Sequence, residues 1–307
     1  LRNPLFLSPI NLGNTANLIG LFGLFAIGQG FVIMTGGIDL SVGSLIALLG
    51  VIFVDMVGKF GVPWPLAMLV TVFIGTLLGL AHGLLITKLK MQPFVVTLCG
   101  LLIYRGVARG YTGEATAGFP FGASYPQLEW LTIGRSFGVP HSFYAMLLVG
   151  VVAWVVLHRS VFGRHLYAVG KNEDAARYSG VRTDFVIISA YVISAALASV
   201  AAIYFAMFTK SVQPSSHGNF YELYAIAAAV REAEKRRAEN PMHNGNEEYN
   251  YFLSVFFPYT DLHIMDYNRV VSDLNGLTKD RFLLSLLKDW LLTPLDRRPE
   301  AVKRRSC

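Results

Sequence analysis

The chain has 307 residues, of which 53% are hydrophobic and 15% are charged, and its mean hydropathy is +0.47. This composition is too apolar for an ordinary soluble domain and indicates a protein that crosses a lipid bilayer several times. The formal net charge of +6 fits the excess of Lys and Arg in the cytoplasmic loops of membrane proteins. We therefore expect no nucleic acid as a partner.

Charge divides the chain into two parts. Residues 1–230 hold 13 of the 26 Lys and Arg and 8 of the 20 Asp and Glu, so residues 231–307 hold the other 13 and 12. We expect a transmembrane domain over residues 1–230 and a small α+β soluble segment of unassigned function over residues 231–307. The chain starts at Leu1, and no signal peptide precedes the first apolar run, so a truncated amino end is expected.

Six apolar runs predict the transmembrane helices of the first part. A helix rises about 1.5 Å per residue, so about 20 residues cross a hydrocarbon core of about 30 Å. A seventh run starts at Tyr221 but gives way to charged residues after Val230. The expected fold class is an all-α polytopic membrane protein with about six spans and a truncated seventh. The six runs cover residues 16–35, 41–57, 63–88, 93–107, 142–157 and 185–208.

Basic residues predict how these spans are oriented across the membrane. Lys88 and Lys90 flank the third run, and residues 158–182 form a basic loop, so both are placed in the cytoplasm. Residues 110–137 are rich in Gly, Pro and aromatic side chains and are expected to form an outside loop. Two cysteines, Cys99 and Cys307, lack the spacing of a metal site.

The first two runs are separated by a glycine-rich break with a carboxylate, Gly36-Gly37-Ile38-Asp39-Leu40-Ser41. Non-helical backbone at membrane depth is tolerated only where protein or water surrounds it, and a carboxylate there lines a pathway or is paired internally. Asp39 is therefore either a polar wall of a pathway or a cap of the next helix, for which Ser41 is a further candidate cap. Gln29 either binds a hydroxylated substrate or bridges two helices.

Three ordered segments resemble the permease subunits of bacterial ATP-binding-cassette importers for monosaccharides, of the ribose, xylose and galactose type. The first is GGIDLSVGS at residues 36–44, and the second is QPFVVTL at residues 92–98, followed by Arg105-Gly106. The third is FGRHLYAVGKNEDAARYSGV at residues 162–181, which is similar to the cytoplasmic coupling loop of the family.

The resemblance implies a transport subunit of the bacterial inner membrane. Its expected partners are cytoplasmic ATPase subunits, a periplasmic sugar-binding protein and a second permease subunit, in a homodimer or heterodimer within the lipid bilayer. The expected substrate path includes Gln29, Gly36, Gly37, Asp39 and Ser41. The expected coupling loop includes Arg164, Gly170, Asn172, Glu173, Asp174, Ala175, Ala176 and Arg177.

The sequence contains no phosphate-binding loop of the form G-x-x-x-x-G-K-[ST]. The nearest candidate, Gly163 to Asn172, has the wrong spacing and lacks the Ser or Thr. ATP is therefore expected in the partner ATPase, with no cofactor, metal or catalytic residue in this chain. We expect a transport subunit rather than an enzyme.

Two departures from the family pattern leave other interpretations open. The family normally has a span before the segment corresponding to residues 1–14, and further spans after Val230. Residues from about Ala227 onward instead resemble the carboxyl part of an uncharacterised soluble bacterial family, with a helix near residues 231–238 and strands near 251–257 and 263–266. The alternatives are a non-functional fusion of two gene fragments, or a secondary carrier with Asp39 and Asp55 as ion sites.

Overall fold

The fold is known from a computed structural model, which describes residues 8–221. Four two-residue strands in this range, β1 (Ala117–Gly118), β2 (Arg135–Ser136), β3 (Val139–Pro140) and β4 (Ser211–Val212), form two small antiparallel ribbons, β1 with β4 and β2 with β3. The helices in this range are α1 (Pro9–Met34), α2 (Val42–Gly58), α3 (Trp64–Lys88), α4 (Pro93–Thr112), α5 (Pro126–Ile133), α6 (His141–Arg159), α7 (Val161–Lys171), α8 (Glu173–Tyr178) and α9 (Thr183–Thr209).

Five of these helices, α1, α3, α4, α6 and α9, are long and apolar enough to cross a membrane, and α2 is a shorter apolar helix. Each coincides with one of the six predicted runs, so the predicted class, a polytopic helical membrane protein, is confirmed. The rest of the predicted seventh run, after Tyr221, and the elements expected in residues 231–307 lie outside the described residues.

Helix α2 lies in the middle of the bundle. It packs against α3, α4 and α9, and nearly all of its side chains are buried. Leu45 and Leu49 share one apolar cluster with Phe25 of α1 and Phe205 of α9. Its 17 residues reach only about 25 Å, so the non-helical residues before Val42 must supply the rest of the crossing.

A glycine stripe on α3 brings that helix close to α9. A Cβ atom at Gly79 would lie 2.6 Å from both the Ala195 Cβ and the Tyr191 carbonyl oxygen, and one at Gly83 would lie 2.8 Å from the Ile188 Cα. Small residues at helical spacing let backbones approach closely in lipid. The small residues of the sixth predicted run, which is α9, therefore meet glycines of the third.

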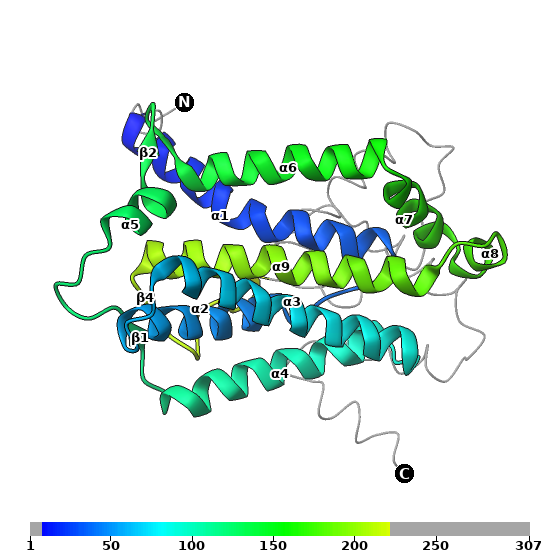
Figure 1. Ribbon diagram of the computed structural model, residues 1–307, viewed down its shortest axis with the longest axis horizontal. Coiled ribbons are helices and arrows are strands. Elements are labelled where there is room, and N and C mark those ends of the chain that lie inside the picture. Colours follow the sequence, from blue (N-terminus) through cyan, green and yellow to red (C-terminus); the bar gives the residue numbers. More distant parts are fainter. Residues whose placement is uncertain (1–7, 222–307) are drawn as a thin grey trace, which may run out of the picture. The chain divides into compact units, whose positions relative to one another are not determined.

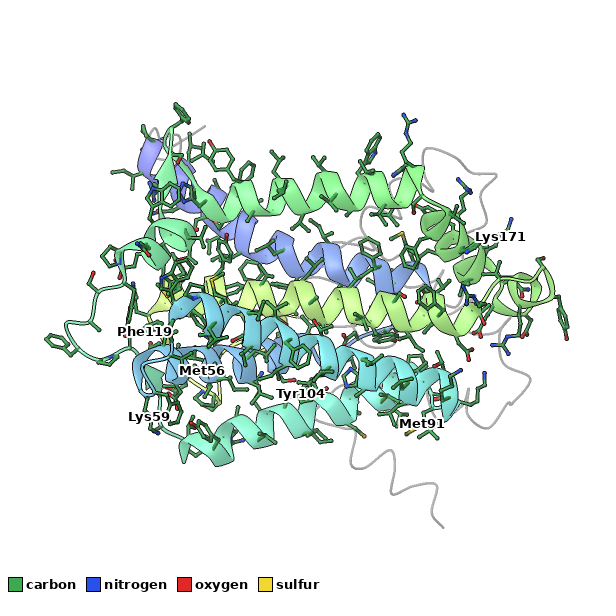
Figure 2. The ribbon with its side chains drawn as sticks, in the orientation of Figure 1. Met56, Lys59, Met91, Tyr104, Phe119 and Lys171 are labelled. Atoms are coloured by element: carbon green, nitrogen blue, oxygen red, sulfur yellow. The ribbon has the colours of Figure 1, made fainter. Side chains whose placement is uncertain are left out.

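The two ends of the bundle carry different short elements. In Figure 1, α5 and the ribbons lie at one end of the long helices, and α7 and α8 lie at the other. Figure 2 places Lys59 and Phe119 at the first end and Lys171 at the second, with Tyr104 between them. The expected outside loop thus contains short structured elements, and the basic loop contains two helices.

Helix α4 is longer than its predicted run, which ends at Val107. It continues to Thr112 and stops at Gly113, whose φ of +60° is the left-handed conformation that glycine adopts readily. Arg105 lies within this helix, and its guanidinium donates hydrogen bonds to the Pro214 and His217 carbonyl oxygens at 2.9 and 2.5 Å. Its charge is therefore hydrogen-bonded inside the bundle.

Candidate translocation site

The break between α1 and α2 begins with a reversal of the chain at two glycines. The Gly37 amide donates to the Val32 carbonyl oxygen at 3.1 Å, which closes the end of α1. Gly36 has a φ of +78°, which side chains other than glycine rarely adopt. A Cβ at Gly37 would lie 2.7 Å from the Tyr191 hydroxyl of α9. The backbone geometry therefore explains why glycine occupies both of these predicted positions.

Asp39 is 2% exposed and serves the start of α2. Its Oδ1 atom accepts hydrogen bonds from the Ser41 amide at 2.9 Å and the Ser41 hydroxyl at 2.6 Å. Ser41 occupies the N-cap position, but its side chain makes no capping hydrogen bond to the helix. The expectation that Ser41 itself caps α2 is therefore wrong, because its backbone is already helical (φ −82°, ψ −15°) and its hydroxyl instead donates to the Asp39 carboxylate.

Gln29 of α1 is fully buried and reaches the break. Its Nε2 atom donates to the Asp39 carbonyl oxygen at 2.8 Å. This contact fixes α1 to the residues that precede α2, as expected of a bridging side chain. Its other amide atom, Oε1, has no hydrogen-bond partner among residues 8–221, so the contact uses only half of the amide.

Two further side chains hold the break, and their role was not predicted from the sequence. The Ile38 carbonyl oxygen accepts from the Thr97 hydroxyl of α4 and from the Tyr191 hydroxyl of α9, each at 3.3 Å. Thr97 lies in the segment 92–98 that resembles the importer permeases. Tyr191 shares its span with other hydroxyl residues, among them Ser194, so no sequence signal singles it out.

A buried polar pair of α3 and α4 lies next to the start of α2. The Tyr104 hydroxyl and the His82 Nε2 atom are 3.0 Å apart, and their rings stack. Gly100 makes this approach possible, since a Cβ there would lie 2.5 Å from His82 Nε2 and 3.3 Å from the Ser41 Cβ. The lone histidine of the third run was the available sequence signal for this pair.

A cavity of about 320 Å³ opens at the end of the bundle that carries α7 and α8. Gly36 and Gly37 line it together with Gln92, Tyr191 and Glu173 of α8. It therefore joins two predicted path residues to a predicted coupling residue. The other path residues, Gln29, Asp39 and Ser41, are buried in mutual contact and are not part of its lining.

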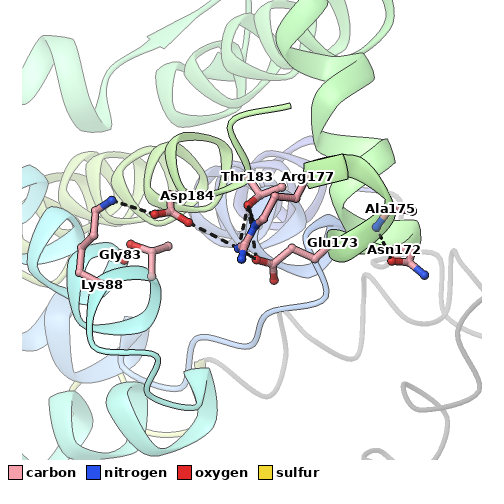
Figure 3. Close-up of polar contacts among 9 residues, drawn as sticks. Gly83, Lys88, Asn172, Glu173, Ala175, Arg177, Thr183 and Asp184 are labelled. Carbon is pink, nitrogen blue, oxygen red and sulfur yellow. Dashed lines mark hydrogen bonds and ion pairs between the residues drawn. The ribbon is translucent and has the colours of Figure 1, made fainter. Parts of the chain in front are cut away.

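Helix α8 is tied to two spans by charged side chains (Figure 3). Arg177 donates to Glu173 at 2.5 Å and to the Thr183 hydroxyl at 3.1 Å, and it lies 3.7 Å from the Asp184 carboxylate. Asp184 in turn pairs with Lys88 of α3 at 2.8 Å. The chain of contacts leads from α8 through the start of α9 to the end of α3.

The remaining predicted coupling residues occupy α7, α8 and the junction between them. The Asn172 side chain caps α8 by accepting from the Ala175 amide at 2.8 Å. Ala176 is buried, whereas Arg164, Asp174 and Ala175 are exposed. Gly170 lies so close to the Met34 carbonyl oxygen of α1 that a Cβ would collide with it. The basic loop therefore also touches the carboxyl end of α1.

These features define a class: a polytopic helical membrane protein with a polar break inside the bundle and a helical loop packed on its spans. The chain belongs to the family described as "Branched-chain amino acid transport system / permease component", which matches residues 11–230. The family described as "Protein of unknown function (DUF1015)" matches residues 224–304. No solved structure matches the chain.

Known relatives narrow the class to sugar permeases of ATP-binding-cassette importers. The chain is 40% identical over 229 residues to the ribose import permease protein RbsC of Bacillus subtilis (strain 168). This alignment covers 74% of this chain and 70% of that protein. It is 35% identical over 226 residues to the galactofuranose transporter permease protein YtfT of Escherichia coli (strain K12), covering 74% and 64%. The chain is thus a multi-pass permease subunit of the inner membrane.

Proposed function

We propose that this permease is the membrane-spanning subunit of an ATP-driven monosaccharide importer, with the sugar path beside the break between α1 and α2 and a cytoplasmic ATPase docked on α7 and α8. The observation that carries the proposal is the continuous contact from Glu173 on α8, through Arg177 and Asp184, to Lys88 on α3. Glu173 also lines the cavity that contains Gly36 and Gly37.

Packing supplies the stiffness that such coupling needs. The ion pairs of Arg177 and Lys88 are partly exposed, and exposed pairs each contribute only about 0–1 kcal/mol. Leu166, Val169 and Ala176 are instead buried in one cluster with side chains of α1 and α9. A buried Leu or Val contributes about 1.5–3 kcal/mol. Movement of α7 and α8 is thus transmitted by apolar contact, while the ion pairs fix the orientation of α8.

The proposed partners and substrate follow from two observations: the sequence contains no phosphate-binding loop, and its relatives are named as sugar import permeases. ATP is therefore bound and hydrolysed in partner subunits. A periplasmic binding protein delivers the sugar, and a second permease subunit completes the path. The relatives include import permeases for ribose, galactofuranose and fructose, which makes a monosaccharide the substrate class.

The test is uptake into membrane vesicles that contain the permease with its ATPase and binding-protein subunits, with radiolabelled ribose, fructose and galactofuranose offered in turn. We expect uptake of at least one sugar to require ATP and to persist when ionophores abolish ion gradients. Arg177→Ala should reduce uptake roughly tenfold, about 1.4 kcal/mol of coupling, and leave ATP hydrolysis running. Arg159→Ala removes the same charge at the end of α6, outside the contact chain, and serves as the control.

Other outcomes would contradict this proposal in recognisable ways. Uptake driven by a Na⁺ or proton gradient without ATP would identify a secondary carrier, with Asp39 and Asp55 as its candidate ion sites. The absence of uptake for every sugar, with all subunits present in the membrane, would support a non-functional fusion.

A further inference from the structure

Three buried polar atoms in the bundle have no hydrogen-bond partner within residues 8–221: Gln29 Oε1, Ser194 Oγ and His217 Nε2. A buried donor or acceptor left unsatisfied costs about 1–3 kcal/mol, so proteins rarely retain one without a reason. The three belong to different segments, namely α1, α9 and the residues after β4. Their positions relative to the start of α2 suggest a common reason.

Gln29 and Ser194 lie at the same level of the bundle. The Nε2 atom of Gln29 bonds to the Asp39 carbonyl oxygen, so the Oε1 atom of the same amide also lies beside the break. Ser194 is one turn from Tyr191, whose hydroxyl bonds to the Ile38 carbonyl oxygen, so both occupy the face of α9 toward the break. A Cβ at Gly28 would lie 3.0 Å from the Ser194 Cα, which places α1 and α9 in contact here.

His217 directly precedes a residue that touches the start of α2. The residue after it, Gly218, has a φ of +72° and approaches the Gly43 carbonyl oxygen so closely that a Cβ would collide with it. The His217 carbonyl is held by Arg105. Its ring meets that of Phe205 edge to face, with centroids 6.0 Å apart. His217 is therefore fixed by its backbone and ring, which leaves Nε2 available for a further bond.

Aromatic rings border this region. Phe25, one turn before Gln29 on α1, stacks on Tyr221 with the ring planes 6° apart. Tyr221 also contacts Phe205, with centroids 5.1 Å apart. Ligand sites are typically apolar and aromatic surfaces with a few polar groups that fix orientation. The rings and the three polar atoms have this composition.

We propose that Gln29 Oε1, Ser194 Oγ and His217 Nε2 form a subsite for the hydroxyl groups of the transported monosaccharide. The amide oxygen only accepts hydrogen bonds, the serine hydroxyl donates and accepts, and the imidazole nitrogen does one or the other according to its tautomer. A polyol presents several hydroxyls that each donate and accept, so one neutral ligand satisfies all three. This inference rests on the proposed function and adds Ser194 and His217 to the predicted path.

Ser194 gives the sharpest test because it separates binding from folding. Removing a hydroxyl without a partner deletes no internal hydrogen bond, so Ser194→Ala should leave the thermal unfolding temperature unchanged or raise it. Ser199→Ala is the matched control on the same helix. Ser199 is equally buried, but its hydroxyl donates to the Ala195 carbonyl oxygen at 2.6 Å.

The experiment measures equilibrium binding of radiolabelled ribose, fructose and galactofuranose to the purified full chain in lipid nanodiscs. For the sugar that binds, we expect Ser194→Ala to raise the dissociation constant roughly tenfold and Ser199→Ala to leave it unchanged. His217→Phe keeps the ring packing and should raise the constant similarly. For one singly deoxygenated form of that sugar, Ser194→Ala and the unaltered chain should bind equally, because the contact is then absent from both.

Equal affinity of the unaltered chain and both subsite variants would overturn the inference, as would binding of none of the sugars. ATP-driven uptake in vesicles is measured in parallel. If uptake by the unaltered chain depends on ATP while Ser194→Ala binds normally, the subsite is wrong and the proposed function stands. If uptake fails for every sugar, the proposed function itself is wrong.

Discussion

The Asp39 carboxylate has two candidate roles, one in folding and one in transport. Its Oδ1 atom accepts from the Ser41 amide and hydroxyl. Asp39→Asn keeps an Oδ1 acceptor there, so we expect its free energy of unfolding to stay within about 1 kcal/mol of the unaltered chain. Asp39→Ala leaves two buried donors of Ser41 unpaired and should lose about 1–3 kcal/mol. Thermal unfolding in detergent measures both.

The uptake of the Asp39→Asn variant then separates the two interpretations of the charge. If the variant is as stable as the unaltered chain but transports no sugar, the negative charge belongs to the path. Unchanged uptake would assign Asp39 to capping alone. A strongly destabilised Asn variant would contradict the hydrogen-bond geometry itself.

Glu129 and Lys210 form a pair whose contribution to stability depends on pH. The Lys210 ammonium donates to the Glu129 carboxylate at 2.7 Å and holds the pKa of Glu129 below its ordinary value of 4.5. A carboxyl whose pKa is lower in the folded state stabilises the fold above its ordinary pKa, and this contribution is lost as pH falls through the folded value. Both groups are partly exposed, so the contribution is about 0–1 kcal/mol.

Glu129→Gln should therefore unfold at a slightly lower temperature than the unaltered chain at pH 7, and the two should converge as the pH falls through the lowered folded-state pKa of Glu129. Unfolding followed by fluorescence across this pH range measures the difference. A gap that does not narrow as the carboxyl groups become protonated would show that the charge of Glu129 is not its source.

Among the elements, the long apolar helices were predictable because hydropathy and length are properties of a single segment. All six predicted runs coincide with helices in the described range. The extension of α4 beyond Val107 was not predicted, because the polar residues near that point, such as Arg105, find hydrogen-bond partners at Pro214 and His217 that are distant in the sequence. The ribbon of β1 and β4 pairs residues nearly a hundred positions apart, and no local pattern predicts such a pairing.

The residues of the candidate site likewise fall into those that the sequence could predict and those that it could not. Asp39, Gly36 and Gly37 were recognisable as a polar, flexible break in an apolar sequence. Their partners Thr97 and Tyr191 come from other spans, and only the fold brings them to the break. The unpartnered atoms of Ser194 and His217 are likewise visible only when neighbouring helices are in place.

The contact of α3 with α9 gives a prediction for a pair of helices. Gly79→Ala should destabilise the protein by about 1–3 kcal/mol, because the new methyl group would meet the Tyr191 carbonyl oxygen and the Ala195 Cβ at 2.6 Å. Thermal unfolding in detergent measures the loss. Gly106→Ala in α4 is the control. No atom lies within 4 Å of a Cβ there, so alanine should stabilise that helix by up to about 1 kcal/mol. Equal effects at both positions would contradict close packing of α3 on α9.

For the whole chain, two families meet near residue 230. The permease family matches residues 11–230 and the family of unknown function matches residues 224–304, in agreement with the resemblance of each part. We hypothesise that the chain is a natural fusion of segments from these two families. Sequencing the genomic locus across codons 220–240 should give one uninterrupted reading frame. Two intact, separate genes there would contradict a natural fusion.

The basic residues predict the orientation of the permease in the membrane. The end of the bundle with α7 and α8 carries Lys88, Lys90, Arg159, Arg164, Lys171, Arg177 and Arg182, whereas the end with α5 carries Lys59, Arg109, Arg135 and Lys210. Cytoplasmic loops carry the excess of Lys and Arg, so α8 is expected inside the cell and α5 outside.

Cysteine labelling tests this orientation with two exposed positions, Phe121 before α5 and Tyr178 at the end of α8. In a background with Cys99 and Cys307 replaced by Ser, Phe121→Cys should react with a membrane-impermeant maleimide on cells whose outer membrane has been permeabilised. Tyr178→Cys should react only after the inner membrane is opened, because α8 then becomes accessible. The reverse pattern would place α8 outside the cytoplasm, where no ATP-hydrolysing subunit could dock on it, and would overturn the proposed coupling together with the orientation.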